Sequence, residues 1–330
     1  MNLEDVAQQA GVSTATVSRV VNNQGVVRKS TRIRVLKVIE ELKYSPNLHA
    51  RALAGSIRMI GLVVSNLENP FFLDIFHHLE IAAHNQGYEV LIANTCYDRE
   101  RLQSSVRMML GRRPSGMAMI VSEMEEGLLD ELLERKIRTV VYDVSPPRPG
   151  ITTIRTNYKR GMQRIVEYLH SLGHRRVAFI GHHPSLGPLS DRQRVFVEVM
   201  ESYQGGVEYR VATSDDSFAG GRQAVRDLFE GFQPTAIVCV NDFIALGVLR
   251  QLRDMGLRVP QDVSVSGFDN ITLSEMVYPA LTTAHIPRDF IGKQILDGVI
   301  GANVLDTNSS KDTLIEPELL VRDSTGPAPV

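Results

Sequence analysis

Apolar residues recur at helical spacing in three short segments at the start of the chain. In residues 3–10 they fall on one face of a helix, and Asn2 can cap its first turn. A glycine-containing break precedes a second helix, expected from Thr14 to about Val21, and a third is expected over 31–42. The pattern predicts a three-helix bundle of about 45 residues that contains a helix-turn-helix unit.

The segment 47–55, which follows Ser45-Pro46, is helix-prone but only two turns long. A helix this short barely recovers its nucleation cost in water, so a binding partner has to order it. The alternative is a linker with some helical character.

From Met59 onward, apolar runs of strand length alternate with amphipathic helical stretches. Strands are expected at 59–64, 89–93, 116–121, 138–143, 176–181, 207–212, 235–240 and 263–268. Helices are expected at 74–86, 99–112, 127–135 and 161–173. This alternation predicts parallel sheets covered by helices, with ligands at the carboxyl ends of the strands. About 270 residues exceed one doubly wound sheet, so two lobes with a cleft between them are expected.

Charge divides the chain at the same place. Residues 1–58 carry nine Lys and Arg against four acidic residues, whereas the rest carries 27 basic and 34 acidic residues. The head is therefore +5 and the body −7, which sum to the overall −2. A cationic module on a mildly acidic body indicates a head that binds a polyanion, attached to a sensing or catalytic unit.

Several classes of protein are disfavoured by what the sequence lacks. It has no amino-terminal signal for export and no apolar run of about 20 residues, so a cytoplasmic protein without membrane contact is expected. Cys96 and Cys239 have no metal-binding spacing and are expected to be reduced core residues. No P-loop, HExxH, GxSxG or GxGxxG motif is present, so neither catalysis nor a cofactor is expected.

Two kinds of polar pair are candidates for sites. His77-His78 and His182-His183 could suggest metal ligands, but adjacent histidines point in different directions, so solvated or capping roles and no metal are expected. Asp215-Asp216 could form a carboxylate pair for acid–base work. A loop turn before the helix that begins near Gly220 is the preferred interpretation.

The second helix of the head carries side chains suited to reading bases. In a helix-turn-helix, the amino-terminal residues of this helix meet base edges in the major groove. Thr14, Ala15 and Thr16 can contact thymine methyl groups or offer hydroxyls, and Arg19 can bind guanine O6 and N7. The alternative is a small helical module for protein interaction.

The segment 47–55 has the composition of a minor-groove contact. It combines Arg51, which can reach the backbone, with small alanines and the bulky Leu53, which can enter a base step and kink the duplex. DNA and the matching segment of a second subunit would supply the order that two turns lack.

These motifs resemble the lactose/galactose-repressor (LacI/GalR) family of bacterial transcription regulators. The head motif is LEDVAQQAGVSTATVSRVVN at 3–22, and the hinge motif is YSPNLHARALA at 44–54. In the body the resemblance rests on IGLV at 60–63, NPFF at 69–72, LGHRRVA at 172–178, PTAIVCVNDFIALG at 234–247, GLRVPQDVSVSGFD at 256–269 and PALTT at 279–283. It spans residues 3 to about 322.

The resemblance implies a DNA site and an effector site. The DNA contacts it implies are Thr14, Ala15, Thr16, Arg19, Asn22, Arg51, Leu53 and Ala54. Effector contacts are expected from the aromatic wall of Phe71 and Phe72 and from the polar groups of Asp143, Arg194, Asn241 and Asp269. The small residue and the aromatic that usually follow this arginine are replaced by Val197 and Glu198, and Asn157 stands where the family often has Asp.

The expected architecture is an all-α head followed by an α/β body like a periplasmic binding protein, with two doubly wound parallel sheets. The expected segments are a DNA-binding domain at 1–45, a hinge helix at 46–57, an effector and dimerisation domain at 58–323 and a flexible tail at 324–330. Within the body, the N-lobe is expected from 58–156 and 287–316, and the C-lobe from 157–286 and 317–323.

The function expected from these features is a DNA-binding transcriptional regulator, most simply a repressor. As a homodimer it would bind a palindromic operator in double-stranded DNA, with an affinity set by a small effector in the cleft. A sugar, a sugar phosphate or another sugar derivative is the expected effector, with nucleosides or nucleobases next. The alternatives are a soluble sugar-binding receptor without a DNA-binding role and an α/β enzyme acting on sugars.

Overall fold

The computed structural model describes residues 2–21, 25–44, 58–143, 146–182, 188–203, 206–301 and 311–329. The chain forms two compact units, a head (Met1–Arg58) and a body (Met59–Val330). Among the described residues, no helix has the length and apolar character needed to cross a bilayer.

The head is a bundle of three helices, α1 (Leu3–Ala10), α2 (Thr14–Val21) and α3 (Lys29–Glu41). Asn2 and Asp5 form a reciprocal capping box at the start of α1. The buried core consists of small and β-branched side chains, namely Val6, Ala7, Ala10, Val17, Val20, Val35 and Val38. The first two helices have the predicted bounds, because both their caps and their apolar spacing are local signals.

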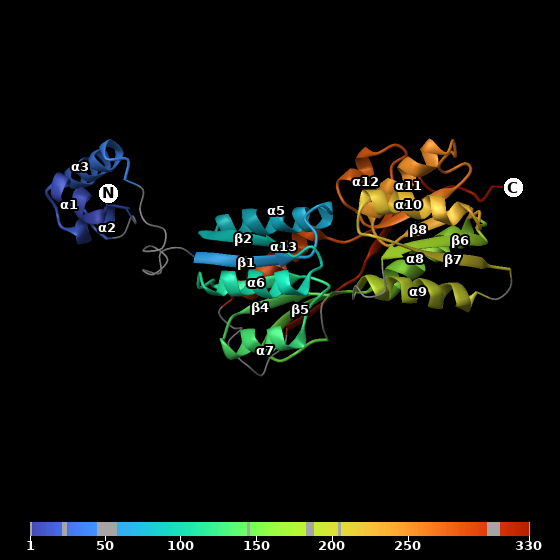
Figure 1. Cartoon of the computed structure of the whole chain (residues 1–330), viewed down its shortest axis with the longest axis horizontal. Helices are drawn as coiled ribbons and strands as arrows, with labels where there is room; N and C mark the ends of the chain where they lie inside the picture. The colour runs from blue at the N-terminus through green and yellow to red at the C-terminus, as the bar shows by residue number, and fades with distance from the viewer. Residues whose placement is uncertain are drawn as a thin grey trace. The chain divides into compact units, whose positions relative to one another are not determined.

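The body contains two six-stranded sheets, each the centre of one lobe. The N-lobe sheet has the order β11-β5-β4-β3-β1-β2 and the C-lobe sheet the order β12-β10-β9-β8-β6-β7. In the C-lobe, β12 runs antiparallel to β10, while the other pairs in that sheet are parallel. Figure 1 shows helices on both faces of each sheet. The predicted fold class, an all-α head followed by a two-lobed α/β body, is confirmed.

The described residues of the N-lobe form four helices around its sheet. Its strands are β1 (Arg58–Val64), β2 (Tyr88–Asn94), β3 (Gly116–Ile120), β4 (Thr139–Tyr142), β5 (Ile151–Thr156) and β11 (Lys311–Ile315). Its helices are α5 (Pro70–His84), α6 (Arg99–Leu110), α7 (Glu126–Glu134) and α13 (Arg288–Ile300). Side chains alternate along β1, so that Leu62 and Val64 join the core under α5 and α13, while Val63 joins the core under α6 and α7.

In the part of the C-lobe that the structure describes, five helices surround the sheet. Its strands are β6 (Arg176–His182), β7 (Glu208–Ser214), β8 (Ala236–Cys239), β9 (Ser264–Asp269), β10 (Thr282–His285) and β12 (Glu318–Leu320). Its helices are α8 (Tyr158–Ser171), α9 (Pro188–Ser202), α10 (Phe218–Phe229), α11 (Asp242–Asp254) and α12 (Leu273–Met276). Helices α8 and α9 pack together, as do α10 and α11.

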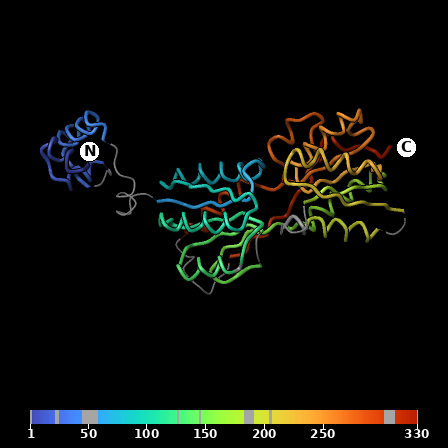
Figure 2. Tube along the Cα trace, viewed as in Figure 1, coloured from blue at the N-terminus to red at the C-terminus, as the bar shows by residue number. Residues whose placement is uncertain are grey.

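The chain passes between the lobes at residue 157, at 286–287 and at 316–317 (Figure 2). These crossovers place the carboxyl ends of the parallel strands of both sheets around a common space. All eight expected strands are present. Four further strands, β5, β10, β11 and β12, were not predicted. They are short or rich in threonine and therefore lack a strong apolar run.

The expected flexible tail at 324–330 is wrong for the residues that the structure describes, 324–329. Ser324 is fully buried, its hydroxyl donates to the carbonyl of Val265 over 2.6 Å, and it accepts from the amide of Thr282 over 2.8 Å. The amide of Ala328 donates to the carbonyl of Leu172 over 2.9 Å. The Gly-Pro-Ala-Pro composition resembles a frayed end, but hydrogen bonds with distant parts of the C-lobe fix the segment.

Candidate functional site

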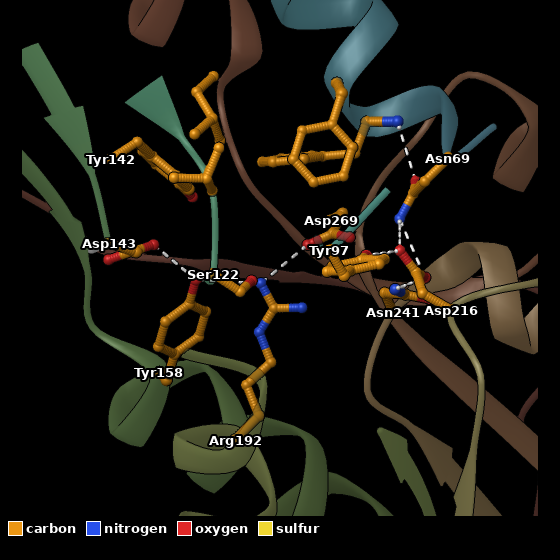
Figure 3. Close-up of a pocket in the computed structure, with 14 residues that line it drawn as sticks. Asn69, Tyr97, Ser122, Tyr142, Asp143, Tyr158, Arg192, Asp216, Asn241 and Asp269 are labelled. Carbon is orange, nitrogen blue, oxygen red and sulfur yellow. Dashed lines mark hydrogen bonds and ion pairs between the residues drawn. The ribbon is translucent and has the colours of Figure 1, made fainter. Parts of the chain in front are cut away.

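A cavity with an empty volume of about 450 Å³ lies between the two lobes. This volume includes space that is open to solvent. Its polar lining comes mainly from residues that follow the carboxyl ends of the parallel strands, as Figure 3 shows. Of the predicted effector residues, it brings together Phe71, Phe72, Asp143, Asn241 and Asp269.

The aromatic wall of the cavity is built at the start of α5. Asn69 caps this helix, because its side-chain oxygen accepts a hydrogen bond from the backbone amide of Phe71 over 3.1 Å. Pro70 occupies the first turn of the helix. The rings of Phe71 and Phe72 then meet edge to face with centroids 5.6 Å apart. Tyr142 extends the wall, with its ring centroid 6.0 Å from that of Phe71. The wall offers an apolar surface to a ligand in the cavity.

Arg192, on α9, supplies the cation of the cavity. Its guanidinium donates to the carbonyl of Val240 over 2.8 Å and to the hydroxyl of Tyr158 over 3.0 Å. It also lies over the rings of Tyr158 and Phe268, 4.4 and 4.8 Å from their centroids. Burial favours a lower pKa for Arg192, but the neighbouring Tyr158 and Asp269 raise the pKa above its usual value. The guanidinium therefore stays charged although it is buried.

The predicted role of Arg194 is wrong, because this residue points away from the cavity. It is exposed and pairs with Asp191 over 3.1 Å and with Glu198 over 2.8 Å on the outer face of α9. When the family spacing is counted from Arg192 instead, the aromatic position falls on the buried Phe196. Arg192, and not Arg194, therefore matches the arginine of the family pattern. Val195 then stands at the position of the usual small residue.

Asp143 and Tyr158 form a hydrogen-bonded pair between the lobes. The Tyr158 hydroxyl donates to Asp143 over 2.5 Å, and the amide of Thr156 donates to the same carboxylate over 2.8 Å. Burial raises the pKa of Asp143, and these two hydrogen bonds oppose the increase. Asp143 thereby orients Tyr158, which in turn accepts from Arg192.

Asp269 keeps a polar atom that the described residues leave without a hydrogen bond. Its Oδ1 lies 3.4 Å from the guanidinium of Arg192, and neither this atom nor Nε of Arg192 has a hydrogen-bond partner in that part of the chain. Burial raises the pKa of Asp269 to about 8, although the charge of Arg192 opposes the increase. Buried polar groups are normally hydrogen-bonded, and both of these residues line the cavity.

Sequence reasoning did not place Asp216 or His182 in this region, and it also missed other residues that line the cavity, namely Asn69, Tyr97, Tyr142, Tyr158 and Arg192. Asp216 lies in the expected loop before α10, but it is buried and lines the cavity. His182, expected to be solvated or capping, is also buried, and its Nε2 lies 3.4 Å from Oδ1 of Asp216. His183 lies outside the described residues.

Strained backbone is concentrated around the cavity. Tyr97, Asp143 and Asp269 all have positive φ angles, of 62°, 49° and 109°. Side chains other than glycine rarely adopt this conformation, and it persists where surrounding contacts over-determine it. These three residues are held in this conformation by contacts between the lobes or with buried partners. The strained backbone therefore supports a functional role for the cavity.

The head presents its predicted base-reading residues on α2. Thr14, Ala15 and Arg19 are exposed and Thr16 is half-buried, with its hydroxyl 3.0 Å from that of Ser13. Ser13 also caps α2 by accepting the amide of Thr16 over 3.2 Å. The other predicted DNA contacts, Asn22, Arg51, Leu53 and Ala54, lie outside the described residues.

Comparison with known proteins accounts for both units. The family described as bacterial regulatory proteins, lacI family, matches residues 2–47, and a periplasmic binding protein-like domain matches residues 166–325. The chain is 32% identical over 328 residues to the HTH-type transcriptional repressor PurR of Vibrio vulnificus (strain CMCP6), covering 98% of each chain. The chain belongs to the lacI family of bacterial regulatory proteins. The predicted family is therefore confirmed.

Further relatives agree with this assignment. A PurR repressor of Aliivibrio fischeri (strain ATCC 700601 / ES114) is 33% identical, covering 98% of this chain and 97% of the relative. The crystal structure of the lac repressor dimer bound to operator and the anti-inducer ONPF is similar, with 28% identity, a TM-score of 0.80 and 99% coverage of each chain.

This lacI-family protein is a DNA-binding transcriptional repressor rather than an enzyme. The match to the lacI family covers the helix-turn-helix head at residues 2–47, and the match to the periplasmic binding protein-like domain covers residues 166–325 of the body. The receptor alternative, which has no DNA-binding role, does not fit the match over the head.

Proposed function

We propose that this repressor binds a palindromic operator as a homodimer and that a small effector in the inter-lobe cavity controls its affinity for DNA. The observation that carries the proposal is the cavity, in which Asp269 and Arg192 keep buried polar atoms that no described residue satisfies. A family member with such a cavity can couple ligand binding to DNA binding through the arrangement of its lobes.

The proposed domain assignment follows the expected one. Residues 1–45 are the DNA-binding domain, 46–57 the hinge and 58–323 the effector and dimerisation domain. The head would read bases with Thr14, Ala15, Thr16, Arg19 and Asn22, and the hinge would contact the minor groove with Arg51, Leu53 and Ala54. A repressor acts where the chromosome lies, so a cytoplasmic location is part of the same proposal.

The proposed effector is an uncharged sugar or sugar derivative. Arg192, Asp143, Asn241 and Asp269 offer donors and acceptors for hydroxyl groups, and the wall of Phe71 and Phe72 suits the apolar face of a pyranose. The described lining contains a single arginine, which already donates to Val240 and Tyr158 and lies beside Asp269, and this disfavours an anionic effector such as a sugar phosphate. A nucleobase or nucleoside is the second candidate.

Exposed apolar residues on the body support a dimer. Leu73 and Ile81 lie two helical turns apart on α5 and are 43% and 46% exposed. Met276 and Tyr278, in and after α12, are 73% and 95% exposed. A two-fold pair of subunits would cover such side chains if they lie at its interface, and it would present two heads to the half-sites of a palindrome.

We expect Arg19→Ala to weaken binding to the operator by roughly 10- to 100-fold at matched salt, because a bidentate contact with guanine is worth about 1–3 kcal/mol. Electrophoretic mobility shift with operator and scrambled duplexes measures this loss. Arg135→Ala, which removes an exposed cation of the body paired with Glu131, is the matched control. Operator binding by the Arg19 variant that equals wild type would refute the base-reading role.

A thermal-shift screen tests the effector class. We expect neutral monosaccharides to raise the melting temperature of the whole protein, and their phosphate esters to raise it less, because ligand binding to the native state stabilises it. Purine and pyrimidine bases form the second arm of the screen. A shift with bases alone would replace the sugar assignment with the nucleobase one.

A further inference from the structure

Asp216 is buried between the lobes, although it belongs to the loop that joins β7 to α10 in the C-lobe. Its carboxylate accepts hydrogen bonds from the side-chain amides of Asn66, over 3.0 Å, and Asn69, over 3.3 Å, and from the hydroxyl of Tyr97. These three donors belong to N-lobe loops that follow β1 and β2. Figure 3 shows Asn69 and Tyr97 directed at the carboxylate.

The C-lobe fixes the same carboxylate from the other side. The side-chain amide of Asn241 donates to Oδ1 over 2.8 Å, and Nε2 of His182 lies 3.4 Å from this atom. Asn241 is itself fixed, because it caps α11 by accepting the amide of Ile244 over 2.9 Å. Asp216 is thus anchored in its own lobe while it binds the other.

Two glycines set the position of this loop. A Cβ on Gly221 would lie 2.3 Å from the backbone oxygen of Ile244, and one on Gly247 would lie 2.1 Å from that of Phe218. Helices α10 and α11 can therefore pack this closely only with glycine at both positions. The close packing brings their amino-terminal ends together and places Asp216 beside Asn241.

The chemistry of the cluster requires an ionised carboxylate. The side chains that hydrogen-bond to the carboxylate of Asp216 in the described structure all donate to it, and the imidazole of His182 lies beside it. Burial alone favours a higher pKa for Asp216, but the hydrogen bond and charge of His182, with the hydrogen bonds of Tyr97 and Asn241, hold the pKa well below its usual range. An asparagine side chain in place of Asp216 would point its N–H groups at neighbouring groups that are themselves hydrogen-bond donors.

Asp216 also joins parts of the lobes that the chain itself does not hold together. Other contacts between the lobes lie close to crossovers in sequence, such as Tyr158 with Asp143 near residue 157 and Arg288 with the carbonyl of Asp269 near 286–287. The partners of Asp216 in the N-lobe are 119 to 150 positions away along the chain. Only non-covalent contacts can hold these loops to the C-lobe.

We propose that Asp216 is a clasp between the lobes, whose carboxylate holds the N-lobe loops of Asn66, Asn69 and Tyr97 against the C-lobe and sets how readily the cavity opens. Asp216 acts as a positioning residue, since opening the cavity on this side requires breaking its hydrogen bonds to all three. The clasp follows from contacts within the chain; only its effect on DNA binding rests on the proposed function.

Asp216→Asn tests the clasp in the full-length protein, with Asp215→Asn as the matched control. The control makes the same change one residue earlier, at an exposed side chain. We expect amide hydrogen exchange in N-lobe peptides that cover 66–72 and 94–98 to accelerate about tenfold or more in the Asp216 variant, because loss of charged hydrogen bonds makes opening easier. The control should exchange like wild type.

A local defect in the C-lobe would give a different result. It would accelerate exchange only in peptides around 214–220 and leave the N-lobe loops at wild-type rates, which would overturn the proposal. The measurement uses neither DNA nor effector, so its failure would leave the repressor function intact, and absence of effector binding would leave the clasp intact.

Tyr97→Phe provides the reciprocal test, including the case in which the Asp216 variant does not fold. It removes one hydroxyl from the N-lobe and keeps the ring. We expect faster exchange across the cleft, in C-lobe peptides covering 214–220. We also expect Tyr97→Phe to have a smaller effect in the Asp216→Asn background than alone, since the two groups contact each other. Unchanged C-lobe exchange, or fully additive effects, would contradict the clasp.

Discussion

Replacing Arg192 with methionine should lower the free energy of unfolding of the body by about 3–5 kcal/mol, as expected when one partner of a buried charged network is removed. In the wild type, the guanidinium donates hydrogen bonds to the carbonyl of Val240 and to the hydroxyl of Tyr158, and it lies beside Asp269. Methionine fills much of the volume but offers no donor. Urea denaturation of the wild type and the variant measures the loss.

Arg194→Met is the control for this prediction, because it makes the same change two residues away on the same helix. Arg194 is exposed and its ion pairs with Asp191 and Glu198 are at the surface, where such pairs contribute little. We expect a change within about 0.5 kcal/mol. Equal losses in the two variants would show that Arg192 has no special part in the cavity.

Helical spacing along the sequence is enough to distinguish these two arginines. Val195, Phe196 and Val199 define the buried face of α9. Arg192 precedes them by three, four and seven positions and so lies on that face, whereas Arg194 is four positions from the exposed Glu198. The prediction of Arg194 conflicted with the family spacing, whereas Arg192 agrees both with that spacing and with the periodicity of the helix.

Asp216 could not be recognised in the same way. Asp215 and Asp216 are identical in type and adjacent, and the features that separate them are contacts with Asn66, Asn69 and Tyr97. Those residues lie more than a hundred positions away, beyond any local pattern. The loop between β7 and α10 was predicted correctly, but the burial of one of its carboxylates depends on how two lobes meet.

The head shows the opposite situation, since nearly all of its structure follows from local signals. Capping by Asn2, the break at Gly11 and the spacing of valines give α1 and α2 their observed bounds. Strands of the body with strong apolar runs were likewise predicted, whereas β5 was missed because its threonines are polar in type although they are buried in the sheet. The polarity of a residue type is therefore a poor guide to its burial where threonine side chains fill part of a core.

Val17→Asp should abolish operator binding while the body remains folded. Val17 is fully buried among Val6, Val20 and Val35 in a core made of small side chains. A carboxylate there has no partner, and burying an unpaired charge costs several kcal/mol, which is comparable to the whole stability of a domain of this size. Calorimetry should show the body transition preserved, because the head has a separate core.

Val26→Asp separates unfolding from the change in charge, because it makes the same substitution at a side chain that is fully exposed. We expect this variant to keep a folded head and to bind the operator within about tenfold of wild type, since one added negative charge affects only the phosphate attraction. Loss of binding in both variants would mean that charge alone explains the effect. Loss in Val17→Asp alone would show that the operator is bound by the folded three-helix head.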